Sequence, residues 1–477
     1  MTRTKTSTGR IRDHLGLTAK LVGTLVISVV ATVGVFLSPF SIGDEPDRDD
    51  RWNEVMNPEN TWVYGGDPYA MNGPDFYEDS LAPSNECLLN ERLCIRLGQK
   101  LVDLEEALES GNQNTWESVF HGDTESEEFT LYSRVFANLT RFQPAYSKLY
   151  LDDLQPTYSS LPRYKGTLHV EICIGSRPCP KTQAEFDTEW VISDKDIALT
   201  TFDNAEQTEE SPLRPTPWEE SNLNVAFQHG AMVAADRESQ FEPSEYSGVV
   251  DDTVERIRQH AFQNTGPAKM IYLADTNTFN SWYTGGWKTT EDEKAFIVPS
   301  YAERPSGDGG RTDIWSVVVN VEAITDASEM IRILSHQMTH ATFLKGKHFD
   351  LNDWPDFIPS NRTWLYEGLA ENVIHGSRFL HEPQITRRYV DGNDITEGVE
   401  FELNHAPGAN DGVRGVSQLA VYYLKEVFDD SFRGFYEAVI VDDVSVDDAA
   451  EEHFGLGETE MWVEVAVYLD RQVFSLL

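Results

Sequence analysis

The sequence predicts an α+β protein in which a transmembrane helix precedes a mixed α/β region and a more regular C-terminal domain. The chain has 477 residues, of which 40% are hydrophobic and 11% aromatic, enough for two or three domains with substantial cores. Segments with apolar residues at helical spacing, such as 96–111, alternate with β-rich segments such as 166–174. Residues 21–43 contain no charged side chain, which indicates a helix that spans a bilayer.

The expected membrane helix at residues 21–43 sets the predicted organisation of the chain. Residues 1–20 carry five basic side chains against one acidic side chain, so they are expected to form a short cytoplasmic tail. A cleaved signal peptide is the alternative, although no A-x-A cleavage site precedes the acidic stretch that follows. Either topology places the bulk of the chain outside the cytoplasm. Residues 44–245 then form an extracytoplasmic α+β region of unknown role, and residues 246–477 form the C-terminal domain.

The charge of the chain is strongly acidic and excludes one class of partner. Eighty acidic residues oppose 38 basic residues, which gives a net charge of −42. Such a surface repels phosphate backbones, so we expect no binding to nucleic acid. The acidic side chains are interpreted as a heavily solvated surface.

Four cysteines agree with an extracytoplasmic location. Cys87 lies close to Cys94 in the sequence, and Cys173 lies close to Cys179. An even number of cysteines outside the cytoplasm indicates disulfides, and four cysteines permit three connectivities. Two local pairs are the simplest choice. A C-x2-C spacing is absent from the sequence, which argues against a zinc site built from cysteine.

One predicted helix carries two histidines at metal-ligand spacing. Asp326 is a suitable N-cap, and Glu329 three residues later completes a capping box. Gly346 is a suitable end of the helix. His336 and His340 lie four residues apart, so one helical turn directs both imidazoles toward one ion.

A second predicted helix follows and carries two glutamates. It is expected to begin near Thr363 and to stop at Gly376. Glu367 and Glu371 lie four residues apart and therefore share one face. An H-x-x-x-H pair alone is a weak signal, but a capped histidine helix followed by an acidic helix is a stronger one.

Together, these two helices resemble the zinc-site helix and the following glutamate helix of the gluzincin-type zinc metallopeptidases. The similarity is greatest to the peptidase domain of bacterial collagenases and related MA-clan proteins. That family has H-E-x-x-H on one helix and a glutamate in an E-G-x-A-E setting on the next; this chain has HQMTH at 336–340 and EGLAE at 367–371. The resemblance covers roughly residues 250–475, including an edge-like strand over 314–323, and implies a gluzincin-like domain at 246–477.

The resemblance also implies roles for individual residues. His336, His340 and Glu367 would be the zinc ligands. Glu371 would orient one of the histidines through the ring nitrogen that does not face the metal. Zinc is therefore the expected cofactor.

Gln337 departs from the family pattern at the position of the general base. In such sites zinc lowers the pKa of its bound water, and the glutamate takes the proton as the water attacks the peptide carbonyl. A glutamine is nearly isosteric, but its amide cannot accept that proton. Losing general-base catalysis costs about 10²–10⁴ in rate, whereas zinc binding needs no base. The sequence thus predicts a metal site with weakened or lost hydrolysis.

Three interpretations of Gln337 stay open, beside a fold that binds no metal. The first is a membrane-anchored pseudopeptidase, a pseudoenzyme that binds a peptide or protein partner. The second is an active zinc metalloendopeptidase in which another carboxylate, such as Glu371, supplies the base. The third is an inactive form made by replacing the glutamate.

Overall fold

The structure is a computed structural model, and it describes most of the chain from Glu91 onward. The described residues are 91–157, 162–174, 181–193, 195–204, 215–228, 231–260, 270–283, 294–301, 310–344, 347–349, 358–375, 380, 382–401 and 410–475.

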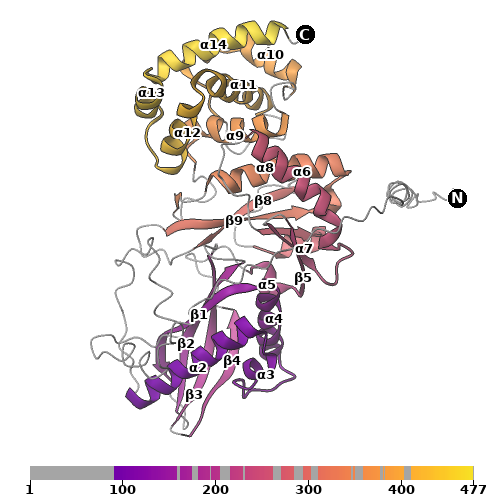
Figure 1. The fold of residues 1–477 in the computed structure, drawn as a ribbon, viewed down its shortest axis with the longest axis vertical. Helices are drawn as coiled ribbons and strands as arrows, with labels where there is room; N and C mark the ends of the chain where they lie inside the picture. The colour runs from indigo at the N-terminus through magenta and orange to yellow at the C-terminus, as the bar shows by residue number, and fades with distance from the viewer. Residues whose placement is uncertain are drawn as a thin grey trace, which may run out of the picture. The chain divides into compact units, whose positions relative to one another are not determined.

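An antiparallel four-stranded sheet and three helices form the first half of the described chain. The strands lie in the order β1-β2-β3-β4, so each pairs with its neighbour in sequence. The helices are α2 (Glu91–Ser110), α3 (Gln113–Glu117) and α4 (Glu127–Arg141), and the strands are β1 (Pro144–Pro156), β2 (Arg163–Ile174), β3 (Lys181–Ile192) and β4 (Ile197–Asn204). Leu97, Leu101 and Leu104 on α2 are fully buried, and α2 lies along the sheet (Figure 1).

A mixed six-stranded sheet forms the centre of the second half. Its order is β10-β9-β7-β6-β5, with β8 paired to β9. β6, β7 and β9 run parallel, whereas β8 is antiparallel to β9. The strands are β5 (Leu223–Gln228), β6 (Ala231–Asp236), β7 (Met270–Ala274), β8 (Ala295–Tyr301), β9 (Gly310–Asn320) and β10 (His348–Phe349).

Helices lie before, between and after the strands of the central sheet in the chain. Before and between its strands lie α5 (Pro217–Glu220), α6 (Ser247–His260) and α7 (Thr276–Ser281). After β9 come α8 (Ala327–Phe343), α9 (Ser360–His375), α10 (Pro383–Gly392), α11 (Asp411–Phe428), α12 (Asp430–Tyr436), α13 (Val446–Phe454) and α14 (Glu458–Ser475). Short 3-10 turns cover Pro243–Tyr246, Val321–Ala323 and Ile395–Glu397, and a π-helical turn, η6, covers Glu437–Val441.

The central sheet separates two hydrophobic cores. In β6, Val233 packs with α6, α8 and α9, while its neighbour Met232 packs with the core of the four-stranded sheet. β7 divides in the same way, with Ile271 on one side and Tyr272 on the other. Because successive strand residues point to opposite faces, a strand buried on both faces is a continuous apolar run.

Two expectations about the central sheet differ from the structure. β5 and β6 belong to the sheet although they precede residue 246, the predicted start of the C-terminal domain. β9, expected to be edge-like, lies between β7 and β8. In the described part of this sheet, β5, β8 and β10 each have a single strand partner, and that of β8 is β9.

The transmembrane part of the predicted fold class is corrected here. No helix in the described part of the chain is long and apolar enough to cross a bilayer. The long helices carry charged side chains along one face, as α2 does with Arg96, Lys100 and Asp103. The expected membrane helix at residues 21–43 and the tail at 1–20 lie outside the described residues. The finding contradicts the transmembrane part of the predicted fold class, and it also contradicts the predicted single-pass membrane localisation.

The described cysteines are oxidised. Cys94 on α2 and Cys173 on β2 are both disulfide-bonded, and no described cysteine is free. Cys87 and Cys179 lie outside the described residues, so the expected pairing stays a prediction.

Candidate metal centre

The histidine helix α8 begins as its sequence predicts. Asp326 is the N-cap, and its carboxylate accepts a hydrogen bond of 2.9 Å from the Glu329 backbone N–H. The Glu329 carboxylate reaches back to the N–H of Thr325, at 2.8 Å, rather than to that of Asp326. Lys294, just before β8, donates to Glu329 at 2.7 Å. This contact ties the start of α8 to the central sheet. The helix ends at Phe343 with Leu344 as its C-cap, and the predicted stop at Gly346 lies outside the described residues.

The two histidines of α8 meet at their ring edges. The Nε2 atoms of His336 and His340 are 3.0 Å apart, and the rings are perpendicular. Met338 between them faces the core and is fully buried. Tyr366 of α9 stacks on the His340 ring with centroids 3.6 Å apart, which restricts rotation of that imidazole.

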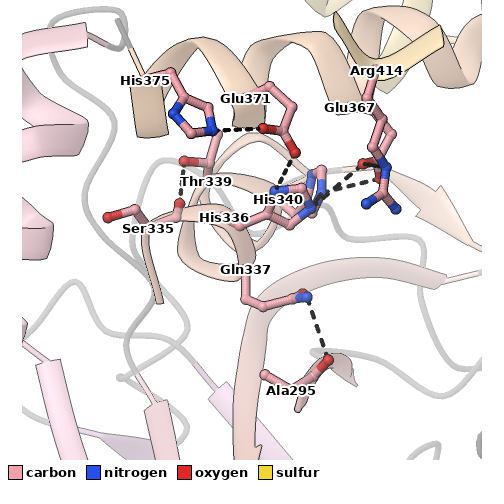
Figure 2. A network of polar contacts seen from close by, with 10 residues as sticks. All are labelled: Ala295, Ser335, His336, Gln337, Thr339, His340, Glu367, Glu371, His375 and Arg414. Atoms are coloured by element: carbon pink, nitrogen blue, oxygen red, sulfur yellow. Dashed lines mark hydrogen bonds and ion pairs between the residues drawn. The ribbon is translucent and has the colours of Figure 1, made fainter. Parts of the chain in front are cut away.

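Helix α9 brings Glu367 to the same point. The helix begins at Ser360, three residues before the expected Thr363, and ends at His375. One carboxylate oxygen of Glu367 lies 3.4 Å from Nε2 of His340, and the other lies 3.5 Å from Nε2 of His336. One ligand atom from each of the three residues can be chosen so that all lie within 4.8 Å of one another. The three predicted ligands are therefore brought together (Figure 2).

The packing of α9 on α11 requires a glycine next to Glu367. A Cβ on Gly368 would lie 2.5 Å from the carbonyl oxygen of Ser417 on α11. Only the absence of a side chain allows the two helix backbones to approach this closely. The G in the EGLAE segment is thus a packing residue that sets the distance between α9 and α11.

The charges at the site suit a divalent cation. Burial, together with the neighbouring His340, lowers the pKa of His336 to about 4, so its lone pair is free at neutral pH. Burial alone would raise the pKa of Glu367, but the two histidines and Arg414 outweigh burial and hold it well below its usual value. The cluster therefore offers imidazole nitrogens and an ionised carboxylate.

The donor set fits zinc in type and spacing. Zinc takes histidine nitrogen and carboxylate oxygen at about 2.0–2.1 Å in a tetrahedron, which puts neighbouring donors about 3.3 Å apart. The separations of 3.0, 3.4 and 3.5 Å among His336, His340 and Glu367 match that value. One oxygen of Glu367 is buried and has no hydrogen-bond partner among the described residues. A buried carboxylate oxygen left in this way is suited to a cation.

Glu371 lies behind His336, on the side away from this cluster. Its Oε1 is 3.6 Å from Nδ1 of His336, and its side chain is only 2% exposed. This is the position expected of a carboxylate that orients a metal-binding histidine.

Three further side chains lie beside the cluster. Arg414 on α11 places its Nε 3.8 Å from a carboxylate oxygen of Glu367. His375 lies 3.3 Å from Glu371. Tyr366, the residue before Glu367 on α9, is buried and stacks on His340. Arg414 comes from a helix 47 residues further along the chain, and no local pattern in the sequence marks it.

Gln337 contacts the central sheet. Its amide donates a hydrogen bond of 3.4 Å to the backbone carbonyl of Ala295, the first residue of β8. In Figure 2 this side chain runs toward Ala295 and away from Glu371. The residue at the predicted general-base position therefore lies between the histidine helix and β8.

Comparison with known proteins adds no family assignment, because no protein-family model and no curated protein matches the chain. The residues of the cluster are therefore the basis for inferring function.

Proposed function

We propose that this chain is a gluzincin-like zinc-binding protein in which peptide hydrolysis is lost or strongly weakened, and that it acts by binding a peptide or protein segment. The observation that carries the proposal is the donor set of His336, His340 and Glu367, with its separations of 3.0–3.5 Å. When bound, zinc would act as a Lewis acid toward a carbonyl oxygen. The chain supplies the ligands for that ion, and Gln337 replaces the proton acceptor.

The position of β8 supports a peptide as the bound partner. β8 adjoins the cluster through the contact of Gln337 with Ala295, and β9 is its only strand partner in the described part of the chain. Extended peptides commonly bind by adding a strand to such an edge. A segment paired there would run past the amide of Gln337.

The geometry argues against Glu371 as a substitute base. Its side chain is 2% exposed, and its two oxygens face Nδ1 of His336 and Nε2 of His375. The metal ligand atom of His336 is Nε2, on the opposite edge of the ring. A carboxylate behind the ring cannot reach a water molecule in front of it, so the active-peptidase alternative would need a different base.

The surroundings of Gln337 fit an amide better than a carboxylate. Its N–H donates to the Ala295 carbonyl, whereas a glutamate would turn a negative oxygen toward that carbonyl oxygen. This contact favours glutamine as the residue suited to the site over a replacement made only to inactivate it.

Metal analysis and a hydrolysis assay test the proposal together. We expect the purified protein to retain zinc, and His340→Ala to lose it, because one of three ligands is removed. On a mixture of unstructured peptides, we expect no cleavage by the parent and measurable cleavage by Gln337→Glu, since a general base contributes about 10²–10⁴ in rate.

Two outcomes would contradict the proposal. A parent protein that cleaves peptides and loses that activity in His340→Ala is an active peptidase. A parent protein that binds no zinc, under conditions in which it is folded, has no metal site of the kind proposed.

A further inference from the structure

His375 is a polar side chain near the cluster to which neither zinc binding nor peptide binding assigns a role. It is the last residue of α9 and lies one helical turn after Glu371. Its Nε2 is 3.3 Å from Oε2 of Glu371, while Oε1 of the same carboxylate is 3.6 Å from Nδ1 of His336. The three side chains therefore form a row, with Glu371 between two imidazoles (Figure 2).

Glu371 is the most deeply buried side chain of this row, so its orientation depends on the groups that face it. The side chain of Glu371 is 2% exposed, compared with 16% for His336 and 22% for His375. A buried carboxylate is stabilised mainly by the groups that face its two oxygens. The 3.6 Å between Glu371 and Nδ1 of His336 is an ion-pair distance, beyond that of a hydrogen bond, so small rotations of the carboxylate decide whether this contact closes to hydrogen-bond distance.

The orientation of Glu371 influences which nitrogen of His336 carries the proton, in competition with Glu367 on the Nε2 side. With a carboxylate facing Nδ1, the tautomer with the proton on Nδ1 is favoured, and the lone pair is left on Nε2, which faces His340 and Glu367. A second imidazole on the far oxygen limits rotation of that carboxylate. The end of α9 is itself held by Arg256 of α6, which donates to the carbonyl of Ile374 at 2.5 Å.

We propose that His375 is a positioning residue for the metal centre: it holds the Glu371 carboxylate against Nδ1 of His336, and so directs Nε2 of His336 to the ion. This inference rests on the proposed zinc site. His375 acts through Glu371 and is not itself one of the proposed ligands.

Zinc affinity of the whole chain, measured by competition with a chromophoric chelator, tests this role. Outer partners of metal-binding histidines change metal affinity by about 10–100-fold when removed. We expect His375→Leu to weaken zinc binding by about tenfold. His375→Gln keeps an N–H donor at the same turn of the helix, and we expect it to stay within about threefold of the parent.

A matched control comes from the first half of the chain. His121 also faces a carboxylate, with its Nδ1 3.3 Å from Asp196, but it is half exposed and lies beside β4 of the four-stranded sheet. His121→Leu makes the same chemical change, and we expect it to leave zinc affinity unaltered. Equal affinity of the parent and His375→Leu would overturn the proposal, as would equal losses in His375→Leu and His375→Gln.

A second readout separates this inference from the proposed function. With 15N-labelled histidine and chelator present, we expect NMR to show a larger fraction of the His336 proton on Nδ1 in the parent than in His375→Leu, because Glu367 faces Nε2 equally in both proteins. If the parent binds no zinc, the proposed function fails, and the tautomer still decides the role of His375. An unchanged tautomer in His375→Leu would overturn the positioning role even in a protein that binds zinc.

Discussion

Replacing Gly368 by alanine tests whether the approach of α9 to α11 builds the candidate metal centre. A Cβ at this position would lie 2.5 Å from the backbone oxygen of Ser417, 2.7 Å from its carbonyl carbon and 2.9 Å from a methyl group of Val421. Two of these three atoms are backbone, so they can move only if α11 moves. Overpacking of this kind costs about 1–3 kcal/mol.

Helix propensity acts in the opposite direction to the clash. The sign of the change in unfolding free energy therefore shows which of the two effects is larger. Alanine is favoured over glycine in a helix interior by about 1 kcal/mol. A clash against backbone is expected at the upper end of the overpacking range, so the net result is a destabilisation of about 1–2 kcal/mol. Because Glu367 is the preceding residue, displacement of α9 should also weaken zinc binding.

Gly248 provides the control for this change. It lies in α6, and a Cβ there would meet no atom within 4 Å. Gly248→Ala should therefore stabilise the protein slightly in urea unfolding and leave zinc affinity unchanged. A Gly368→Ala variant that is stabilised as much as Gly248→Ala would refute the argument that the close approach of the two helices positions Glu367.

Two further predictions concern buried charges. Burial raises the pKa of Glu105 to about 8 from a usual value of 4.5, so the stability this proton gives is complete below about pH 4.5 and is lost as the pH rises through about 8. The decrease in unfolding free energy between pH 5 and pH 8 should therefore be smaller in Glu105→Gln than in the parent, by up to a few kcal/mol. Equal decreases in the two proteins would contradict this. Asp443 accepts from the buried Lys347 at 2.8 Å and from Arg362 at 2.9 Å, and Asp443→Asn should cost about 1–2 kcal/mol because its own side chain is half exposed. Adding Lys347→Met should recover part of that loss in a double-mutant cycle, and strict additivity would count against a coupled pair.

Local signals in the sequence were sufficient for the elements that carry the ligands. Asp326 caps α8 as predicted, since a cap depends only on the next three residues. The four-residue spacings of His336 to His340 and of Glu367 to Glu371 place each pair on one helical face. The meeting of these two faces was expected from the family resemblance, and it could not be derived from either helix alone.

Features that depend on distant partners were missed. Residues 166–174, within β2, are β-rich in the sequence, but their partner strand β1, which begins at Pro144, was not predicted. Strand pairing is set by a neighbour and overrides weak local preference. β5 and β6 join the second sheet through pairing with β7, across a stretch that contains a whole helix. Arg414 reaches Glu367 for the same reason, because the packing of α11 on α9 brings it there.

Metal binding and hydrolysis make different demands on this site, and its residues meet only those of binding. Binding requires converging lone pairs held rigidly, and the stacking of Tyr366 on His340 supplies such rigidity at one ligand. Hydrolysis also requires a proton acceptor in front of the ligand atoms. Among the carboxylates contacting the cluster in the described part of the chain, Glu367 is a proposed ligand and Glu371 faces Nδ1 of His336, on the side away from the cluster. Gln337, at the position of the general base, is an amide that donates to Ala295. A site with this geometry is therefore expected to hold zinc and a peptide without cleaving the peptide.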